Sequence, residues 1–152
     1  MGNDVSVRKV KIGMKKMALR VAAFWAIAAA ALPGGAAAPV SLRGKLIQPE
    51  GRPAIETAEH KVVRLEASDE PIGGVLADKR LAGSDVEVLG HYAAPDRFVV
   101  DPVHTRPVFV HKGGKRLYVT YWCEVCAIRT YTPGKCWCCQ KETDLDLRET
   151  EQ

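Results

Sequence analysis

All five cysteines of this 152-residue chain lie within 17 positions, from 123 to 139. They form two Cys-x-x-Cys pairs, Cys123 with Cys126 and Cys136 with Cys139, and Cys138 lies inside the second pair. A tetrahedral zinc site needs four thiolates at about 2.3 Å, and a two-residue spacer lets two sulfurs converge on one ion. The spacing therefore predicts two metal-binding knuckles that face each other across a hairpin, with Cys123, Cys126, Cys136 and Cys139 as the ligands.

The N-terminal segment has the three parts of a secretory signal. Six Lys and Arg residues precede an apolar run from Val21 to Leu32, and Ala36 to Ala38 supply the small residues that a signal peptidase requires. The apolar run has only 12 residues, which is short for a permanent membrane anchor. We therefore expect residues 1–37 to be removed and the protein to be periplasmic or secreted. It would contact a membrane only through an uncleaved signal.

Removal of the signal changes the electrostatic argument. The whole chain has 22 basic and 18 acidic residues and a formal charge of +4. Residues 1–37 carry six of the basic residues and one of the acidic residues, so the remainder has 16 and 17 and a charge of −1. The basic character belongs to the signal, and it gives no support for nucleic acid as a partner.

Short runs of alternating apolar and polar residues, bounded by turn signals, follow the signal. This pattern predicts strands with one buried face. Residues 74–81 carry apolar side chains at helical spacing and are the only helix expected in this region. A helix between the third and fourth of five strands is the order of a small Greek-key barrel. We therefore predict an all-β fold with such a barrel at residues 38–106 and strands at 40–47, 54–57, 61–66, 85–92 and 97–100.

The same region resembles the secreted bacterial OB-fold domains. The resemblance is carried by Val40-x-Leu42-x-Gly44 in the first strand and by Leu81-Ala82-Gly83-x-Asp85-Val86-x-Val88-x-Gly90 at the fourth. It covers residues 39–103 and implies an OB-like barrel, with glycines where tightly coiled strands bend.

Residues 107–152 are expected to form a β-hairpin that leads into the zinc ribbon. Two strands, 108–111 and 116–122, flank a Lys-Gly-Gly-Lys turn, in which the glycines allow the positive φ that a tight hairpin needs. After the cysteines, we expect residues 142–152 to form a last strand that frays into a tail.

The cysteine segment also resembles the heavy-metal-binding domain of copper efflux proteins and copper-transporting ATPases. The shared pattern is Tyr121-x-Cys123-x-x-Cys126 followed by Pro133-Gly134-Lys135-Cys136-x-x-Cys139. The resemblance places Cys126 at a family histidine and Gln140 at a family glycine, and the family's final methionine is missing. Four thiolates suit structural zinc, or a rubredoxin-like iron, better than a labile copper site.

The cysteines have two other interpretations. In an exported protein, structural disulfides are the default, but the odd count leaves one thiol over, and a Cys-x-x-Cys ring is too small to stabilise a fold much. A redox-active dithiol needs a thiolate of low pKa at a helix N-terminus, and neither pair lies at the start of a predicted helix. Trp122 and Trp137 adjoin the knuckles, and we expect them to cover the site and exclude water.

The leading hypothesis is an exported, non-enzymatic binding or scaffold protein with a structural four-cysteine metal site. Zinc is the expected ion, iron or copper being possible, and the partner would be a protein or an envelope ligand. One alternative is a periplasmic copper or zinc buffer or chaperone that uses the same cluster. A second alternative is a thiol–disulfide oxidoreductase. Tyr118, Tyr121 and Tyr131 near Arg116 and Arg129 are also compatible with a nucleic-acid platform, which export and the near-neutral charge oppose.

Overall fold

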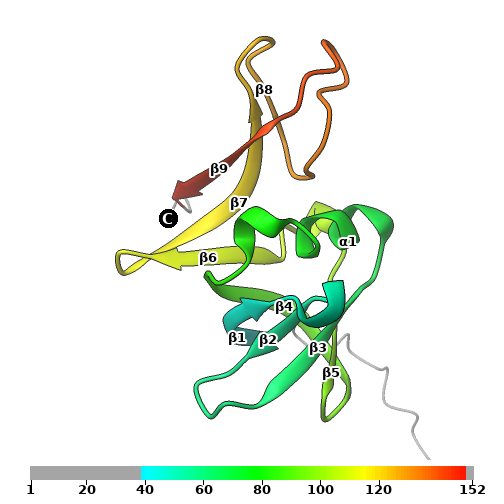
Figure 1. Cartoon of the computed structure of the whole chain (residues 1–152), viewed down its shortest axis with the longest axis vertical. Helices are drawn as coiled ribbons and strands as arrows, with labels where there is room; N and C mark the ends of the chain where they lie inside the picture. The colour runs from blue at the N-terminus through cyan, green and yellow to red at the C-terminus, as the bar shows by residue number, and fades with distance from the viewer. Residues whose placement is uncertain (1–38, 150–152) are drawn as a thin grey trace, which may run out of the picture. The chain divides into compact units, whose positions relative to one another are not determined.

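A computed structural model describes residues 39–149 (Figure 1). The expected signal at residues 1–37 lies outside this range, as do residues 150–152 of the expected tail. Among the described residues, no helix is both long enough and apolar enough to cross a membrane.

Residues 39–149 form nine strands and one α-helix. The α-helix is α1 (Glu70–Leu76), and short 3-10 turns occur at Pro49–Gly51, Lys79–Leu81 and Val103–Thr105. The strands are β1 (Val40–Ile47), β2 (Ala54–Glu56), β3 (Val62–Ala67), β4 (Asp85–Ala94), β5 (Arg97–Val100), β6 (Val108–Lys112), β7 (Lys115–Cys123), β8 (Ile128–Thr130) and β9 (Asp144–Glu149).

The first five strands close into a barrel. Along the sheet they follow the order β1-β2-β3-β5-β4, and β4 pairs back with β1 over six residues. All of these pairings are antiparallel except the one between β3 and β5. The predicted all-β fold with a small OB-like barrel is confirmed, and the remaining strands are additions to that barrel.

Period-two alternation places one face of each barrel strand inside. In β1, Leu42 and Leu46 are buried, and the position between them is Gly44. A Cβ at Gly44 would collide with the carbonyl oxygen of Glu56, and a Cβ at Gly90 in β4 would collide with that of Val99. Glycine is therefore required where neighbouring strands approach most closely inside the coiled barrel.

The helix begins earlier and ends earlier than the predicted 74–81. The Asp69 carboxylate accepts a hydrogen bond of 2.8 Å from the backbone N–H of Ile72, which starts α1 at Glu70. The chain leaves the α-helix after Leu76, and the Asp78 carboxylate then caps a separate 3-10 turn, Lys79–Leu81. Two acidic caps thus divide one apolar pattern into two helical pieces, and both pieces contribute buried side chains to the core.

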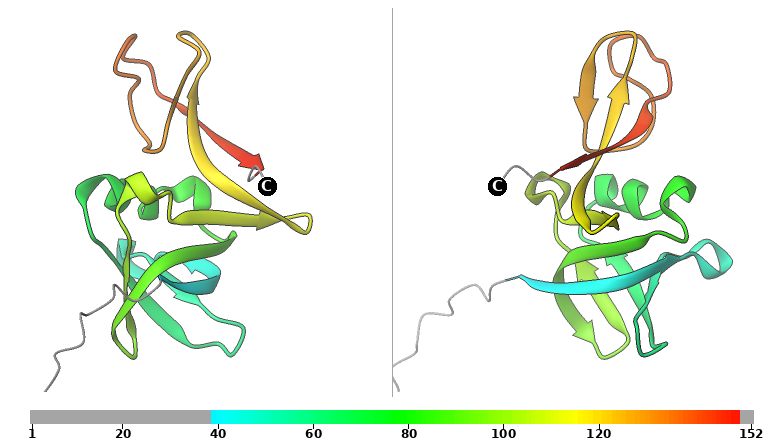
Figure 2. Two further views of the ribbon diagram at one scale, coloured as in Figure 1. Left: turned by 180° about the vertical axis from the view of Figure 1, so that it is seen from behind. Right: turned by 90° about the vertical axis from the view of Figure 1, so that its left-hand side faces the viewer.

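The β6–β7 hairpin forms as predicted and belongs to the same sheet as the barrel. β6 pairs with β4, and Val108, Val110, Val119 and Tyr121 lie in the same hydrophobic cluster as the barrel residues. All described residues fall within one compact unit. β7 continues beyond the barrel and pairs with both β8 and β9 (Figures 1 and 2). β7 is therefore anchored in the core through Val119 and Tyr121, and its C-terminal end at Cys123 supports the cysteine segment.

A polar cluster joins four strands on the outside of the barrel. The Glu87 carboxylate on β4 accepts hydrogen bonds from Ser41 (2.8 Å) and Arg116 (2.9 and 3.0 Å), and it lies 2.7 Å from the His111 ring. Partial burial acts to raise the pKa of Glu87, but the contacts with His111, Ser41 and Arg116 outweigh it and lower the pKa overall. Glu87 therefore stabilises the joint between the barrel and the hairpin as an anion.

Candidate metal centre

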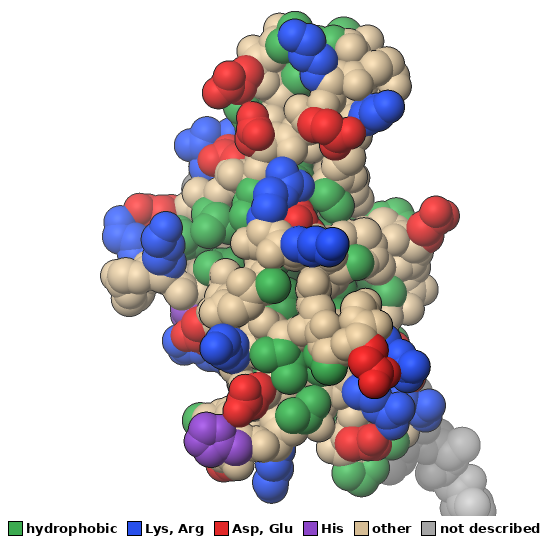
Figure 3. All heavy atoms as spheres, viewed as in Figure 1, with side chains coloured by type: hydrophobic (Ala, Val, Ile, Leu, Met, Phe, Trp, Pro, Cys, Tyr) green, Lys and Arg blue, Asp and Glu red, His purple; other side chains and the backbone are tan. Residues whose placement is uncertain are grey.

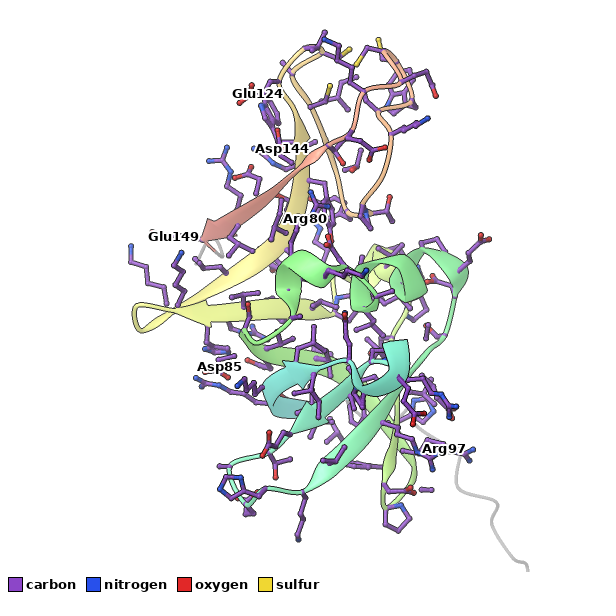
Figure 4. All side chains as sticks on the ribbon, in the orientation of Figure 1. Arg80, Asp85, Arg97, Glu124, Asp144 and Glu149 are labelled. Carbon is purple, nitrogen blue, oxygen red and sulfur yellow. The ribbon has the colours of Figure 1, made fainter. Side chains whose placement is uncertain are left out.

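The end of β7, the strands β8 and β9 and the segments between them are called the ribbon below. Two turns at its far end carry the cysteines. Cys123 is the last residue of β7 and pairs with Ile128 of β8, so the first Cys-x-x-Cys forms the turn between these strands. The second lies in a small hairpin closed by a β-bridge between Lys135 and Glu142 and by a 2.8 Å hydrogen bond from the Cys136 N–H to the Lys141 carbonyl. Figure 4 shows the sulfur atoms gathered at these two turns.

The structure brings the four predicted ligand residues together. The Sγ atoms of Cys123, Cys126, Cys136 and Cys139 all lie within 4.8 Å of one another. Those of Cys123 and Cys139 are 3.5 Å apart. Four sulfurs placed about 2.3 Å from one ion have edges of about 3.8 Å, whereas bonded sulfurs are about 2.05 Å apart. All five cysteines are free thiols in the structure. The arrangement can hold one metal ion in a tetrahedral thiolate site.

The four thiols differ in their exposure to solvent. Cys123 and Cys136 are buried, and Cys126 and Cys139 are half-buried. Cys138 is exposed and does not belong to the four-sulfur group. Cys139, the predicted ligand, therefore belongs to the four-sulfur group, and Cys138 does not.

The residue that follows each Cys-x-x-Cys pair has a left-handed backbone. Ala127 has φ 52° and Gln140 has φ 60°. Residues with a Cβ rarely adopt this conformation, and glycine adopts it readily. Gln140 therefore adopts the left-handed conformation itself, and its Nε2 donates a 3.3 Å hydrogen bond to the Trp137 carbonyl.

The local electrostatics favour the thiolate of one cysteine and oppose that of two others. Backbone N–H groups of Cys139 and Cys138 lower the pKa of Cys136 to about 7. The neighbouring thiol of Cys138, followed by desolvation, raises the pKa of Cys126. At Cys123 the N–H of Cys126 acts to lower the pKa, but desolvation and the adjacent thiols raise it overall. Full ionisation of the cluster therefore requires a cation among the sulfurs.

The expectation that both tryptophans cover the site is wrong for Trp137. Its side chain is 73% exposed in the second turn, and Val125 in the first turn is also exposed. Trp122 is half-buried, and the Arg129 guanidinium lies over its ring at 4.9 Å. Each knuckle directs its cysteines inward, so the residue between them in the turn points away from the sulfurs.

One arginine connects the barrel to the ribbon. Arg80 follows Asp78 in the 3-10 turn after α1, binds the Asp78 carboxylate at 2.8 Å, and donates a 2.9 Å hydrogen bond to the Thr143 carbonyl (Figure 4). Its guanidinium also lies 5.2 Å from the centre of the buried Tyr121 ring. Sequence reasoning missed this contact because 63 residues separate Arg80 from Thr143.

The candidate nucleic-acid platform does not form as a unit. Tyr121 is fully buried, and Arg116 is engaged by Glu87. Tyr118, Arg129 and Tyr131 do line one groove, together with arginines that the sequence argument had not included.

Comparison of the chain with protein-family models, with curated proteins and with solved structures found no match. The resemblances to heavy-metal-binding domains and to secreted OB-fold domains therefore stay predictions. The fold and the cysteine cluster stand on the structure alone.

Proposed function

We propose that this chain is an exported, non-enzymatic binding protein whose ribbon is held together by one structural zinc ion on Cys123, Cys126, Cys136 and Cys139. The observation that supports it best is the convergence of these four sulfurs within 4.8 Å. Four thiolates complete a tetrahedral shell and leave no open position for a substrate.

The packing around the cysteines indicates why the ribbon needs an ion. Among residues 124–142, Cys136 is the only one that is buried. A segment of this length without apolar side chains in a core cannot offset the conformational entropy that its folding costs. A structural zinc site contributes about 10–16 kcal/mol of apparent binding free energy at neutral pH, which is ample for a segment of this size.

The described surface and the burial of the cysteines oppose two other roles. On the face shown in Figure 3, Lys and Arg are interspersed with Asp and Glu, which does not favour a nucleic-acid partner. A thiol–disulfide oxidoreductase needs an exposed thiolate of low pKa. Cys136 has the lowered pKa, but its side chain is buried, so a disulfide substrate could not reach it.

Elemental analysis and a thiol count on the purified chain test the metal centre. We expect one zinc per chain and five free thiols after denaturation in chelator. Replacement of Cys136 by Ser should abolish stoichiometric binding, whereas Cys138→Ser, the matched control two positions away, should retain it. A metal-free chain with two disulfides would end the proposal.

Hydrogen exchange tests whether the ion is structural. Strong chelation should remove protection from residues 124–142, where only Cys136 is buried, and leave it at β1–β5 and in β7 up to Tyr121, which lies in the core. Export is tested separately, because the envelope fraction should contain a chain that begins at Ala38 or Pro39.

A second candidate function is a soft-metal carrier, and Cys138 favours it. Its exposed thiol lies beside Cys126, where it could receive an ion that leaves the cluster. A carrier should release its ion to a modest competitor within seconds and keep an ordered ribbon when empty. Slow release, together with loss of protection at residues 124–142, distinguishes the structural site from the carrier.

A further inference from the structure

A groove on the ribbon side of the molecule gathers positive charge and aromatic rings. It has a volume of about 790 Å³. Its lining includes three arginines and two tyrosines: Arg106, Arg129, Arg148, Tyr118 and Tyr131. Tyr118, Arg129 and Arg148 come from β7, β8 and β9, and Arg106 follows the last 3-10 turn. This volume lies within the range of small-molecule sites in proteins.

The three arginines are only partly neutralised. The Asp146 carboxylate accepts hydrogen bonds of 2.9 Å from both Arg129 and Arg148, so one negative charge serves two guanidinium groups. Within residues 39–149, the Arg106 guanidinium forms no ion pair. Glu149 at the rim is engaged by Lys115. The groove therefore carries about two positive charges in excess, while the chain after its signal is close to neutral.

Arg106 has the surroundings of a preorganised anion-binding side chain. Its guanidinium lies 4.7 Å from the centre of the Tyr131 ring and 5.9 Å from that of Tyr118. Aromatic faces hold the planar group in place and leave its N–H donors directed along its edges, where carboxylate and phosphate oxygens bind in pairs. The backbone of Arg106 is left-handed, with φ 53°, a conformation that a non-glycine residue rarely adopts.

The apolar surface beside the groove is too small to be the main attraction. Arg106 and Tyr131 also border a recess among Val103, Pro107 and Val119, and its volume of about 10 Å³ is close to that of a single water probe. A ligand in the groove would therefore be held through charge and aromatic contact.

We propose that this groove binds a small organic dianion through its carboxylate or phosphate oxygens. Arg106 is the main anchor, and Arg148 and Arg129 supply the remaining positive charge. This deepens the proposed function, since it rests on the chain being a binding protein, and it gives that protein a site and a class of ligand. The excess of two positive charges matches a dianion, and the fork of each guanidinium matches a pair of oxygens.

Calorimetric titration of the metal-loaded full chain tests the site, with succinate as the carboxylate probe and glycerol 3-phosphate as the phosphate probe. At low ionic strength we expect one saturable site, and the tighter probe identifies the preferred oxyanion. Arg106→Gln should weaken binding at least tenfold, and Arg106→Lys less, because lysine keeps the charge without the fork. Arg148→Gln should also weaken binding, which keeps the test valid if Arg106→Gln does not fold.

The matched control is Arg97→Gln, which removes the same charge from an exposed barrel arginine whose partner is Glu66 at 3.4 Å. It should bind as the unmodified chain does. Equal weakening by Arg97→Gln and Arg106→Gln, or no binding of either probe, overturns the groove. Zinc measured in the same samples separates the two proposals. A zinc-loaded chain that binds no dianion refutes the groove alone, and a chain that takes up no zinc but still shows Arg106-dependent binding refutes the metal centre alone.

Discussion

Replacement of Ala127 by glycine should tighten metal binding, because the change removes a backbone cost next to the first pair of ligands. Ala127 is exposed and has φ 52°. The left-handed region costs an L-residue about 1–2 kcal/mol. Glycine loses about 0.5–1 kcal/mol more conformational entropy than alanine when it is ordered. The difference between these two costs stabilises the folded ribbon by about 0.5–1 kcal/mol.

This gain should appear in the metal affinity. If the ribbon folds as it binds the ion, a gain of about 0.5–1 kcal/mol raises the apparent affinity about two- to fivefold. Competition with a chromophoric chelator measures that ratio directly. Gln140→Gly should give a smaller gain, because the change also removes the hydrogen bond from the Gln140 side chain to the Trp137 carbonyl.

The control is Ala77→Gly at the end of α1, where the alanine is also exposed but its φ is −84°. Glycine has no conformational advantage at that position, so this variant should lower the free energy of unfolding of the barrel by about 0.5–1 kcal/mol and leave the metal affinity unchanged. If Ala127→Gly instead weakens metal binding, the left-handed turn does not carry the cost assigned to it, and the reasoning about the knuckles is wrong.

Three further predictions concern single side chains. Iodoacetamide should modify one thiol of the native, metal-loaded chain, and Cys138→Ser should abolish that reaction. Arg80→Ala should lower the free energy of unfolding in urea by about 1–3 kcal/mol, because the mostly buried Asp78 carboxylate and the Thr143 carbonyl lose a charged donor, while zinc stoichiometry stays at one. Glu87→Gln should destabilise the chain at pH 7, and this effect should shrink as the pH falls below the unfolded pKa near 4.3. A carboxylate whose pKa is lowered in the folded state stabilises the fold above the unfolded pKa, and that stabilisation is lost as the pH falls through the folded pKa.

The barrel could be predicted because its determinants are local. Alternation in β1 and β4 identifies the buried face without knowledge of the partners, and a glycine such as Gly44 marks a close approach between strands. The start of α1 could also have been predicted, because Asp69 followed by Glu70 and Pro71 is a helix-start signal. The prediction followed the apolar spacing at 74–81 instead and therefore placed the helix too late.

The cysteine cluster could be predicted for the same reason, and its surroundings could not. Two residues between paired cysteines fix the turn that brings their sulfurs together, whereas adjacency to a cysteine does not fix the direction of Trp137. The groove depends on the register of β9 against β7, in which Tyr118 pairs with Arg148. No spacing rule relates Arg106 to Arg148 before that register is known.

The two proposed sites share the ribbon, and this predicts how they are coupled. Arg129 and Tyr131 lie within residues 124–142, the segment expected to lose its order without metal. Arg106 and Tyr118 lie outside that segment, as does Arg148 on β9, a strand whose Leu145 and Leu147 pack against the core. Chelation should therefore weaken binding of the preferred dianion about three- to tenfold, the scale of one lost charged contact (about 0.7–1.4 kcal/mol), without abolishing it. Calorimetry on the loaded and the chelated chain measures this ratio. Unchanged affinity would show that Arg129 and Tyr131 take no part in the groove, and complete loss would show that the metal orders β9 as well.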